Sequence, residues 1–410
     1  MVISPELDRR NGLIFIWTQL LVYLAAPVLY VGVVQAAFCD KLGASATVAN
    51  LPSSTYALGA VSPIICAWFF PARLEKVIVG RAFAIVAASM LLVCFVVFFP
   101  APNWLRITVV IGQGMVIGII NSITNMFLFK CLARGTTEQG RTWALKYAFG
   151  FGPVTAVAGS LAAQLLLSGK IPGVPYPYNF GVLYAVALPC TVLCARLASR
   201  FRIVDVAELP RSPFWSYLME SAKAFVLDRR LIVAWLAFFL WFCTYGTMTN
   251  LSLYTRVAVG RTPLELAGVV MALRFGVKSV AGFGLGALAT RSGPRMAMIA
   301  AVILLGTGPI WPFVSSGYGY LFAFGLMGAG ELGGVYFVNY VISISTPATT
   351  TRNIALLSLV TPASSIAPAL HGSLTDHFGF NASFLFGIAT AVAALALLLR
   401  IGRSTERAIN

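Results

Sequence analysis

About twelve apolar stretches, each near the length of a membrane-spanning helix, fill most of this chain. An α-helix rises about 1.5 Å per residue, so crossing a hydrocarbon core about 30 Å thick takes about 20 mostly apolar residues with internally bonded backbone. The stretches occupy residues 13–36, 46–70, 77–99, 105–129, 143–167, 180–198, 231–254, 264–289, 296–314, 318–343, 353–374 and 382–399. They predict an all-α polytopic membrane protein with twelve transmembrane helices.

Composition agrees with this class. The 410 residues are 59% hydrophobic and 10% charged, with a mean hydropathy of +0.86, and are too apolar for a soluble globular domain. The seven cysteines lie mostly inside the apolar stretches, which is typical of small packing residues. We therefore expect no disulfide framework, no metal site and no cofactor.

The net charge of +16 suggests a nucleic-acid partner, but the positions of the cations argue against one. If the N-terminus is cytoplasmic, most Lys and Arg residues fall in or beside cytoplasmic segments, as the positive-inside rule requires. The exceptions on the outer side are Lys41, Arg106, Lys170, Arg256 and Arg261. We expect an integral protein of a bacterial cytoplasmic (inner) membrane, with both termini in the cytoplasm and no nucleic-acid partner.

A long polar stretch separates two sets of six apolar stretches. It contains Pro210, Pro213 and a short amphipathic run, and is typical of a linker with an interfacial helix. The sets echo each other weakly, for example in Gly112-Gln113 and Gly330-Glu331, so duplication of a six-helix unit is the simplest explanation. The predicted domains are residues 1–199 (a six-helix bundle), 200–230 (a cytoplasmic linker with an amphipathic helix) and 231–410 (a second six-helix bundle).

Twelve spans in two halves with a basic central loop resemble the major facilitator superfamily over nearly the whole chain. The most specific local match lies between the eighth and ninth spans and is similar to the family's cytoplasmic G-x-L-x-D-R-x-G-x-R motif, with Thr290 at its acidic position. The matching residues that we assign to a cytoplasmic gate are Gly286, Arg291, Gly293 and Arg295.

Two further turns resemble parts of that family. The turn over residues 71–81 keeps the basic residues and a carboxylate of the gate motif but not their spacing. The segment 372–379, at the outer turn, resembles another motif of the family. The resemblance implies alternating access, in which two pseudo-symmetric bundles rock about a central site and such turns act as latches. The alternative is that they are ordinary tight turns.

Charged side chains within the spans are the best indication of function, because an ionised group at the bilayer centre costs at least about 2.5 to 3.5 kcal/mol on insertion scales. Arg274 and Lys278 lie one helical turn apart in the eighth stretch and share a face. Two adjacent cations favour an anion, and an Arg fork binds carboxylate or phosphate through two hydrogen bonds. The alternative is charge compensation by Glu331, at similar depth in the tenth stretch, which could also carry a coupling proton.

Neutral polar side chains lie at depths suited to a central cavity. A hydrogen bond between helices or an anchor at the membrane interface is the alternative role for each. Together with Arg274 and Lys278, the candidate substrate contacts are Gln19, Tyr23, Asn121, Asn125, Trp241, Tyr245, Tyr336 and Asn339. Glycines in the tenth stretch, including Gly330, Gly333 and Gly334, predict close helix packing or a hinge.

We interpret the chain as a secondary active transporter, a symporter or antiporter, of a small organic anion such as a carboxylate or a phosphate ester. It would act as a monomer in the lipid bilayer, with a proton as a candidate coupling ion. One alternative is an exporter of amphipathic or cationic compounds, although Val110 replaces the arginine of the R-x-x-Q-G element that many proton-driven exporters carry. The other is a nontransporting receptor on the same fold. We expect no enzymatic activity, because no span carries an H-E-x-x-H or paired-aspartate arrangement.

Overall fold

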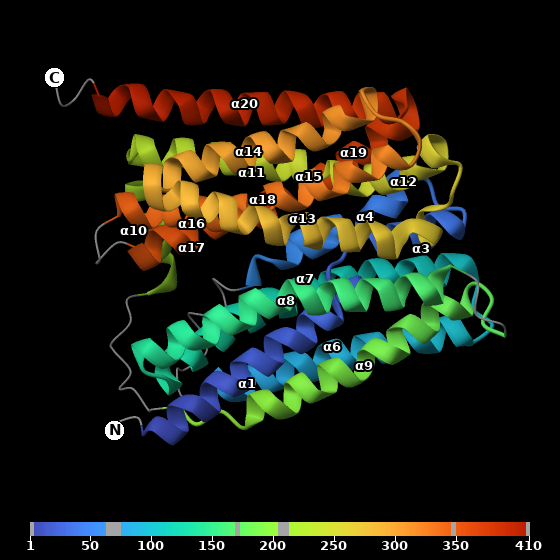
Figure 1. Cartoon of the computed structure of the whole chain (residues 1–410), viewed down its shortest axis with the longest axis horizontal. Helices are drawn as coiled ribbons and strands as arrows, with labels where there is room; N and C mark the ends of the chain where they lie inside the picture. The colour runs from blue at the N-terminus through green and yellow to red at the C-terminus, as the bar shows by residue number, and fades with distance from the viewer. Residues whose placement is uncertain (1–3, 63–74, 169–172, 204–212, 346–349, 407–410) are drawn as a thin grey trace. The chain divides into compact units, whose positions relative to one another are not determined.

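The computed structural model describes residues 4–62, 75–168, 173–203, 213–345 and 350–406. Every regular element in these ranges is a helix, as Figure 1 shows. Nine stretches of the described residues are long and apolar enough to cross a membrane. The predicted all-α polytopic membrane class is confirmed.

The chain divides into two compact units. The first consists of Met1–Ala44, Leu51–Pro210 and Thr262–Ala272, and the second of Ser45–Asn50, Arg211–Arg261 and Leu273–Asn410. The predicted domain boundaries at 199 and 230 stay a prediction.

In the first unit, long helices pack lengthwise around an apolar core. Helix α1 lies along α8 and α9, and α6 lies along α7 and α9, so these helices run side by side in Figure 1. Their facing side chains include the buried Phe15, Phe127 and Cys131. The helices of this part of the chain are α1 (Pro5–Leu24), α2 (Ala26–Leu29), α3 (Val33–Lys41), α4 (Ala46–Gly59), α6 (Glu75–Phe98), α7 (Asn103–Gly135), α8 (Glu138–Leu167) and α9 (Tyr178–Ser199).

In the second unit, α20 lies along α11, α14 and α19, and α14 also packs on α15 and α16 (Figure 1). The elements of this part of the chain, of which α13 extends over both units, are α10 (Phe214–Leu227), α11 (Arg229–Tyr245), α12 (Thr247–Val259), α13 (Pro263–Ser292), α14 (Pro294–Ile310), η2 (Trp311–Phe313), η3 (Gly317–Leu321), α15 (Phe322–Gly330), α16 (Gly333–Ile344), α17 (Thr350–Ser358), α18 (Val360–Ala363), α19 (Ile366–Phe378) and α20 (Phe380–Glu406).

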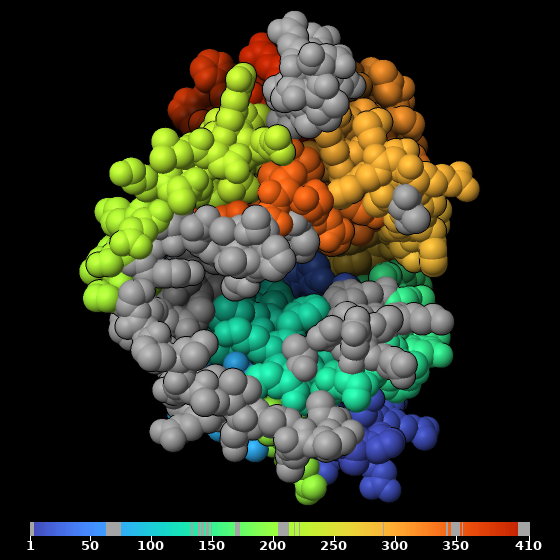
Figure 2. All heavy atoms as spheres, turned by 90° about the vertical axis from the view of Figure 1, so that its left-hand side faces the viewer, coloured from blue at the N-terminus to red at the C-terminus, as the bar shows by residue number. Residues whose placement is uncertain are grey.

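The predicted polar linker contains an amphipathic helix, α10. Its Phe225 is buried, whereas Trp215 and Met219 are 70% and 66% exposed. In Figure 2 the yellow-green atoms of α10 and α11 lie at the surface. Asp228 separates the two helices and caps α11 by accepting a hydrogen bond from the amide of Arg230 (2.9 Å). Exposed apolar side chains on such a helix suit the membrane interface that the sequence predicts.

Several predicted spans are interrupted among the described residues, so a span is not always one continuous helix. The first is divided into α1, α2 and α3, and the eleventh into α17, α18 and α19. In the first span, Pro27 has no amide hydrogen to donate and Gly32 has φ +151°, a conformation that suits glycine. The seventh span is divided at Gly246 and the tenth at Glu331–Leu332.

Candidate functional site

The break in the tenth span lies at the candidate residue Glu331. Helix α15 ends at Gly330 and α16 begins at Gly333. A continuous helix would join the amide of Gly334 to the carbonyl of Gly330, but this amide donates to the carbonyl of Glu331 (3.1 Å). The break therefore frees the carbonyl group of Gly330 from the helical pattern.

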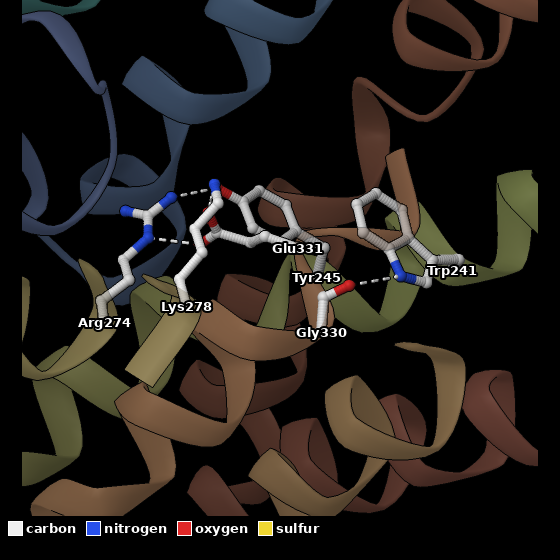
Figure 3. Close-up of polar contacts among 6 residues, drawn as sticks. All are labelled: Trp241, Tyr245, Arg274, Lys278, Gly330 and Glu331. Atoms are coloured by element: carbon white, nitrogen blue, oxygen red, sulfur yellow. Dashed lines mark hydrogen bonds and ion pairs between the residues drawn. The ribbon is translucent and has the colours of Figure 1, made fainter. Parts of the chain in front are cut away.

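The freed carbonyl receives a side-chain donor from the seventh span. The indole Nε1 of Trp241 on α11 donates to the carbonyl oxygen of Gly330 (3.2 Å), as drawn in Figure 3. Trp241 is 3% exposed and packs against Phe238 and Phe337. A Cβ atom on Gly333 would lie 2.6 Å from this Nε1, so glycine at position 333 leaves room for the indole.

The break in the seventh span has a similar arrangement. Nε2 of the buried His371 lies 2.8 Å from the carbonyl oxygen of Cys243, and its Nδ1 lies 2.8 Å from Oγ of Ser383. A neutral imidazole with its hydrogen on Nε2 satisfies both contacts, because Nδ1 then accepts from the serine hydroxyl. A Cβ on Gly246 would lie 3.0 Å from the imidazole Cδ2. At each break a glycine thus admits a ring whose N–H bonds to a backbone carbonyl.

A cluster of charged side chains connects the two breaks. Nε of Arg274 donates to Oε1 of Glu331, and Nζ of Lys278 donates to Oε2 of the same carboxylate (2.9 Å). Nη2 of Arg274 donates to the hydroxyl of Tyr245 (2.6 Å), the last residue of α11. Figure 3 shows both cations directed toward Glu331 from α13. Arg274 therefore contacts a residue at each of the two breaks.

Close helix packing makes this cluster possible. A Cβ on Gly328 would lie 2.8 Å from the carbonyl carbon of Arg274, and one on Gly325 would lie 2.7 Å from a methyl group of Val277. The two glycines therefore let the backbone of α15 approach that of α13 at the level of Arg274. Gly330 likewise leaves room for the backbone of α14 at Leu305, whereas Gly333 leaves room for the indole of Trp241.

Two positive charges share one negative charge in this cluster. The exposed fractions of the side chains are 4% for Arg274, 7% for Glu331 and 21% for Lys278. Both carboxylate oxygens bind a cation, and the formal charges of these three side chains sum to +1 in a low-dielectric interior. The more exposed of the two cations, Lys278, is the better placed to meet a ligand.

The other predicted substrate contacts lie on helices of both units. In the first unit, Gln19 and Tyr23 lie near the end of α1 and are buried, Asn121 donates to the hydroxyl of Tyr56 (2.8 Å), and Asn125 is exposed. On α16 of the second unit, Tyr336 is buried and Asn339 is exposed. The structure brings together Arg274, Lys278, Glu331, Tyr245 and Trp241.

The predicted gate motif forms the turn between α13 and α14. Gly293 has φ +82°, which favours glycine, and Pro294 begins α14. Arg291 is exposed, and Nη2 of Arg295 donates to the carbonyl of Leu398 (3.2 Å). A Cβ on Gly286 would lie 4.0 Å from the hydroxyl of Tyr336. Of the predicted first-half counterpart, 71–81, residues 71–74 lie outside the described residues and 75–81 belong to α6.

The motif-like segment 372–379 at the outer turn also makes a contact in the structure. Asp376 accepts hydrogen bonds from the amides of Ala46 (3.0 Å) and Thr47 (2.9 Å), the first residues of α4. Partial burial acts to raise the pKa of Asp376, but these bonds and one from the hydroxyl of Thr47 outweigh it and hold that pKa below its usual range. The carboxylate therefore caps a helix from a distant part of the sequence.

Sequence reasoning missed the roles of His371 and Gly330. For Trp241, a predicted substrate contact with a hydrogen bond between helices as the alternative, the structure shows such a hydrogen bond. The run from Gly330 to Gly334 carries the signal for the break, because it places three glycines within five positions. Across the described ranges of the chain, no group of three or more His, Cys, Asp or Glu side chains could hold a metal ion.

Comparison with solved structures identifies the fold. Two structures of the nucleoside transporter NupG, one of them a mutant, match with TM-scores of 0.64 and 0.69 at 10% sequence identity. Each covers 96% of this chain, and the matches include 98% and 99% of the NupG chains. A bacterial homologue of the iron transporter ferroportin, in an inward-facing state, matches with a TM-score of 0.69 at 15% identity, covering 95% of this chain and 98% of its own.

The sequence matches no protein-family model and no curated protein. At such low identities the likeness to solved structures concerns the fold alone. The resemblance that the twelve spans and the gate motif indicated is confirmed at this level: the chain is an all-α polytopic membrane protein with the major facilitator fold.

Proposed function

We propose that this protein is a secondary active transporter that moves a small organic anion, a carboxylate or a phosphate ester, by alternating access. The fold supports the transport part of the proposal, because the matched structures are a nucleoside transporter and a homologue of an iron transporter. Their cargoes do not decide the substrate of this chain, since one fold serves many functions.

The observation that carries the choice of an anion is the shared carboxylate. Arg274 and Lys278 both bind Glu331, so the cluster has one more positive than negative charge. A buried excess cation is costly unless a ligand or water compensates it, and a bound anion does so most directly. A ligand with a single negative charge would make the cluster neutral.

The side chains then have different roles. Arg274 is nearly fully buried and engaged by both Tyr245 and Glu331, so it holds the seventh and tenth spans to α13. Lys278, with 21% of its side chain exposed, contacts the substrate. Glu331 balances charge, and as a carboxyl group beside two cations it is also the candidate carrier of a coupling proton. Uptake that keeps its dependence on a pH gradient in Glu331→Gln would remove the residue from coupling.

Thermal unfolding of the purified protein in detergent tests the proposal. The protein is titrated with monocarboxylates, phosphate monoesters and cationic amphiphiles of similar size. A ligand at 100 times its Kd stabilises the folded state by about 2.7 kcal/mol, which is readily measured. We expect an anion to raise the Tm of the wild-type protein and of Lys223→Gln, a charge-matched control exposed on α10, but not that of Lys278→Gln.

Other outcomes point elsewhere. If only cationic amphiphiles stabilise the protein, the exporter alternative replaces the proposal. If an anion binds but is not taken up by proteoliposomes, the chain is a receptor on a transporter fold. An anion that stabilises wild type and Lys278→Gln equally would contradict the proposed site.

A further inference from the structure

We propose that Trp241 is a positioning residue that, through the backbone of the tenth span, holds Glu331 between Arg274 and Lys278. The inference rests on the proposed function and adds the group that keeps Glu331 between its two cations. In this proposal Trp241 acts on the site through its hydrogen bond to Gly330 and does not contact the substrate.

The geometry of the break gives the first reason. Glu331 immediately follows Gly330, so the direction of its side chain depends on where α15 stops. With the indole N–H bonded to it, the Gly330 carbonyl is satisfied without the amide of Gly334. Without that donor, the buried carbonyl would gain most by bonding Gly334 in a continuous helix, because an unpaired buried carbonyl costs about 1 to 3 kcal/mol.

Helix geometry gives the second reason. Glu331 has helical torsions and its amide bonds the carbonyl of Met327, so closing the break would change the torsions that follow Glu331 and shift α16 against α15, with Glu331 at the junction. The carboxylate now bonds two cations at once, through Oε1 to Arg274 and Oε2 to Lys278, and such a two-sided contact tolerates little rotation. The Lys278 contact, at the end of a long flexible chain and partly exposed, would be lost first.

The packing around the indole gives the third reason. Trp241 and Tyr245 lie one turn apart on α11 with nearly parallel rings, 8° between planes and 5.8 Å between centroids. The indole of Trp241 donates to the carbonyl of Gly330, and the hydroxyl of Tyr245 accepts a hydrogen bond from Arg274. One face of α11 therefore contacts both the residue before Glu331 and a cation that binds Glu331. Figure 3 shows this sequence of contacts from Trp241 through Gly330 and Glu331 to the cations.

The reactivity of the Lys278 amine towards an acylating reagent reports whether Lys278 is bound to Glu331, and measuring it does not require the substrate to be known. An ammonium group bound by a carboxylate must leave it and lose its proton before it can be acylated. We therefore measure acetylation of Lys278 by acetic anhydride in the full-length protein in detergent, by peptide mass spectrometry. The exposed Lys223 of α10 is the internal reference.

Four variants make the test specific. Glu331→Gln removes the partner of Lys278 and is expected to raise its acetylation several-fold relative to Lys223. Trp241→Phe keeps a ring but removes the donor, and is expected to raise it several-fold as well. Trp235→Phe, on the same helix with its ring stacked on Phe239, is the matched control and should leave it unchanged. The double variant Trp241→Phe/Glu331→Gln should react no faster than Glu331→Gln, because residues acting through one contact are not additive.

The outcomes separate the two proposals. If Glu331→Gln raises Lys278 acetylation and Trp241→Phe does not, the role of Trp241 is overturned and the anion site stands. Additive effects in the double variant would show that Trp241 acts by loosening the helices in general, which also overturns it. If Glu331→Gln leaves Lys278 unchanged, the charge cluster itself is absent, and both the inference and the proposed function fail.

Discussion

Nη2 of Arg274 lies 2.6 Å from the hydroxyl oxygen of Tyr245, and Tyr245 is the residue at which α11 ends. The same guanidinium binds Glu331, at the end of α15. One cation on the continuous helix α13 therefore joins the two spans of the second unit that are broken at Gly246 and at Glu331–Leu332. Broken helices expose backbone groups at membrane depth, and in transporters such breaks accompany binding sites.

The two cations of the cluster should differ in their effect on stability. Replacing Arg274 by Gln leaves Tyr245 and one oxygen of Glu331 without their cation, and loss of one partner from a buried ion pair costs about 3 to 5 kcal/mol. Lys278→Gln leaves the Arg274–Glu331 contact in place, so its thermal unfolding should shift much less. Equal losses of Tm in the two variants would contradict the division of roles.

A methyl group at position 333 should displace the indole of Trp241. Its Cβ would lie 2.6 Å from Nε1, whereas a Cβ on the neighbouring Gly334 meets nothing within 4 Å. Gly333→Ala should therefore raise Lys278 acetylation as Trp241→Phe does, and Gly334→Ala should not. The reverse order, or no difference between the two alanines, would show that room for the indole does not govern the break.

The buried histidine should matter for stability, and the exposed one should not. His371→Ala removes the hydrogen bonds of the ring to the carbonyl of Cys243 and to the hydroxyl of Ser383, and each loss is expected to cost about 0.5 to 1.5 kcal/mol. His377→Ala removes an exposed side chain and should stay within about 0.5 kcal/mol of the wild type. Thermal unfolding of both variants in detergent decides between these expectations.

Asp376 should stabilise the protein in a pH-dependent way. The pKa of its carboxyl group lies below the ordinary value of 3.8, so the folded protein favours the charged form. The resulting stability is fully present above that value and is lost as the pH falls through the lower pKa of the folded state. The Tm difference between wild type and Asp376→Asn should be constant near neutral pH and should shrink below 3.8. A difference that grows with acid would refute the capping role.

Hydropathy alone located the spans of the fold well, because burial in lipid demands long apolar helices. The predicted stretch 264–289 lies inside α13, Pro263–Ser292, and 143–167 lies inside α8, Glu138–Leu167. The charged residues of the cluster could also be identified from the sequence, because Arg, Lys and Glu are rare within apolar stretches. In the structure the side chains of Arg274 and Lys278 contact that of Glu331.

The breaks were harder to predict. Glycine and polar residues flank the breaks, but α13 carries Gly276, Lys278 and Gly282 without a break, so residue type alone does not locate one. What fixes the break near Gly330 is a donor from another span, Trp241, some ninety positions earlier in the chain, and sequence periodicity carries no information on such a contact. The same holds for His371 at the carbonyl of Cys243, and for Asp376 at the start of α4.

A structure of the protein with the anion that best stabilises it would test the anion site most directly. We expect the bound carboxylate or phosphate to lie within hydrogen-bond distance of Nζ of Lys278, with Arg274 still bound to Tyr245. An anion bound away from both cations, or a positively charged ligand beside Glu331, would contradict this expectation.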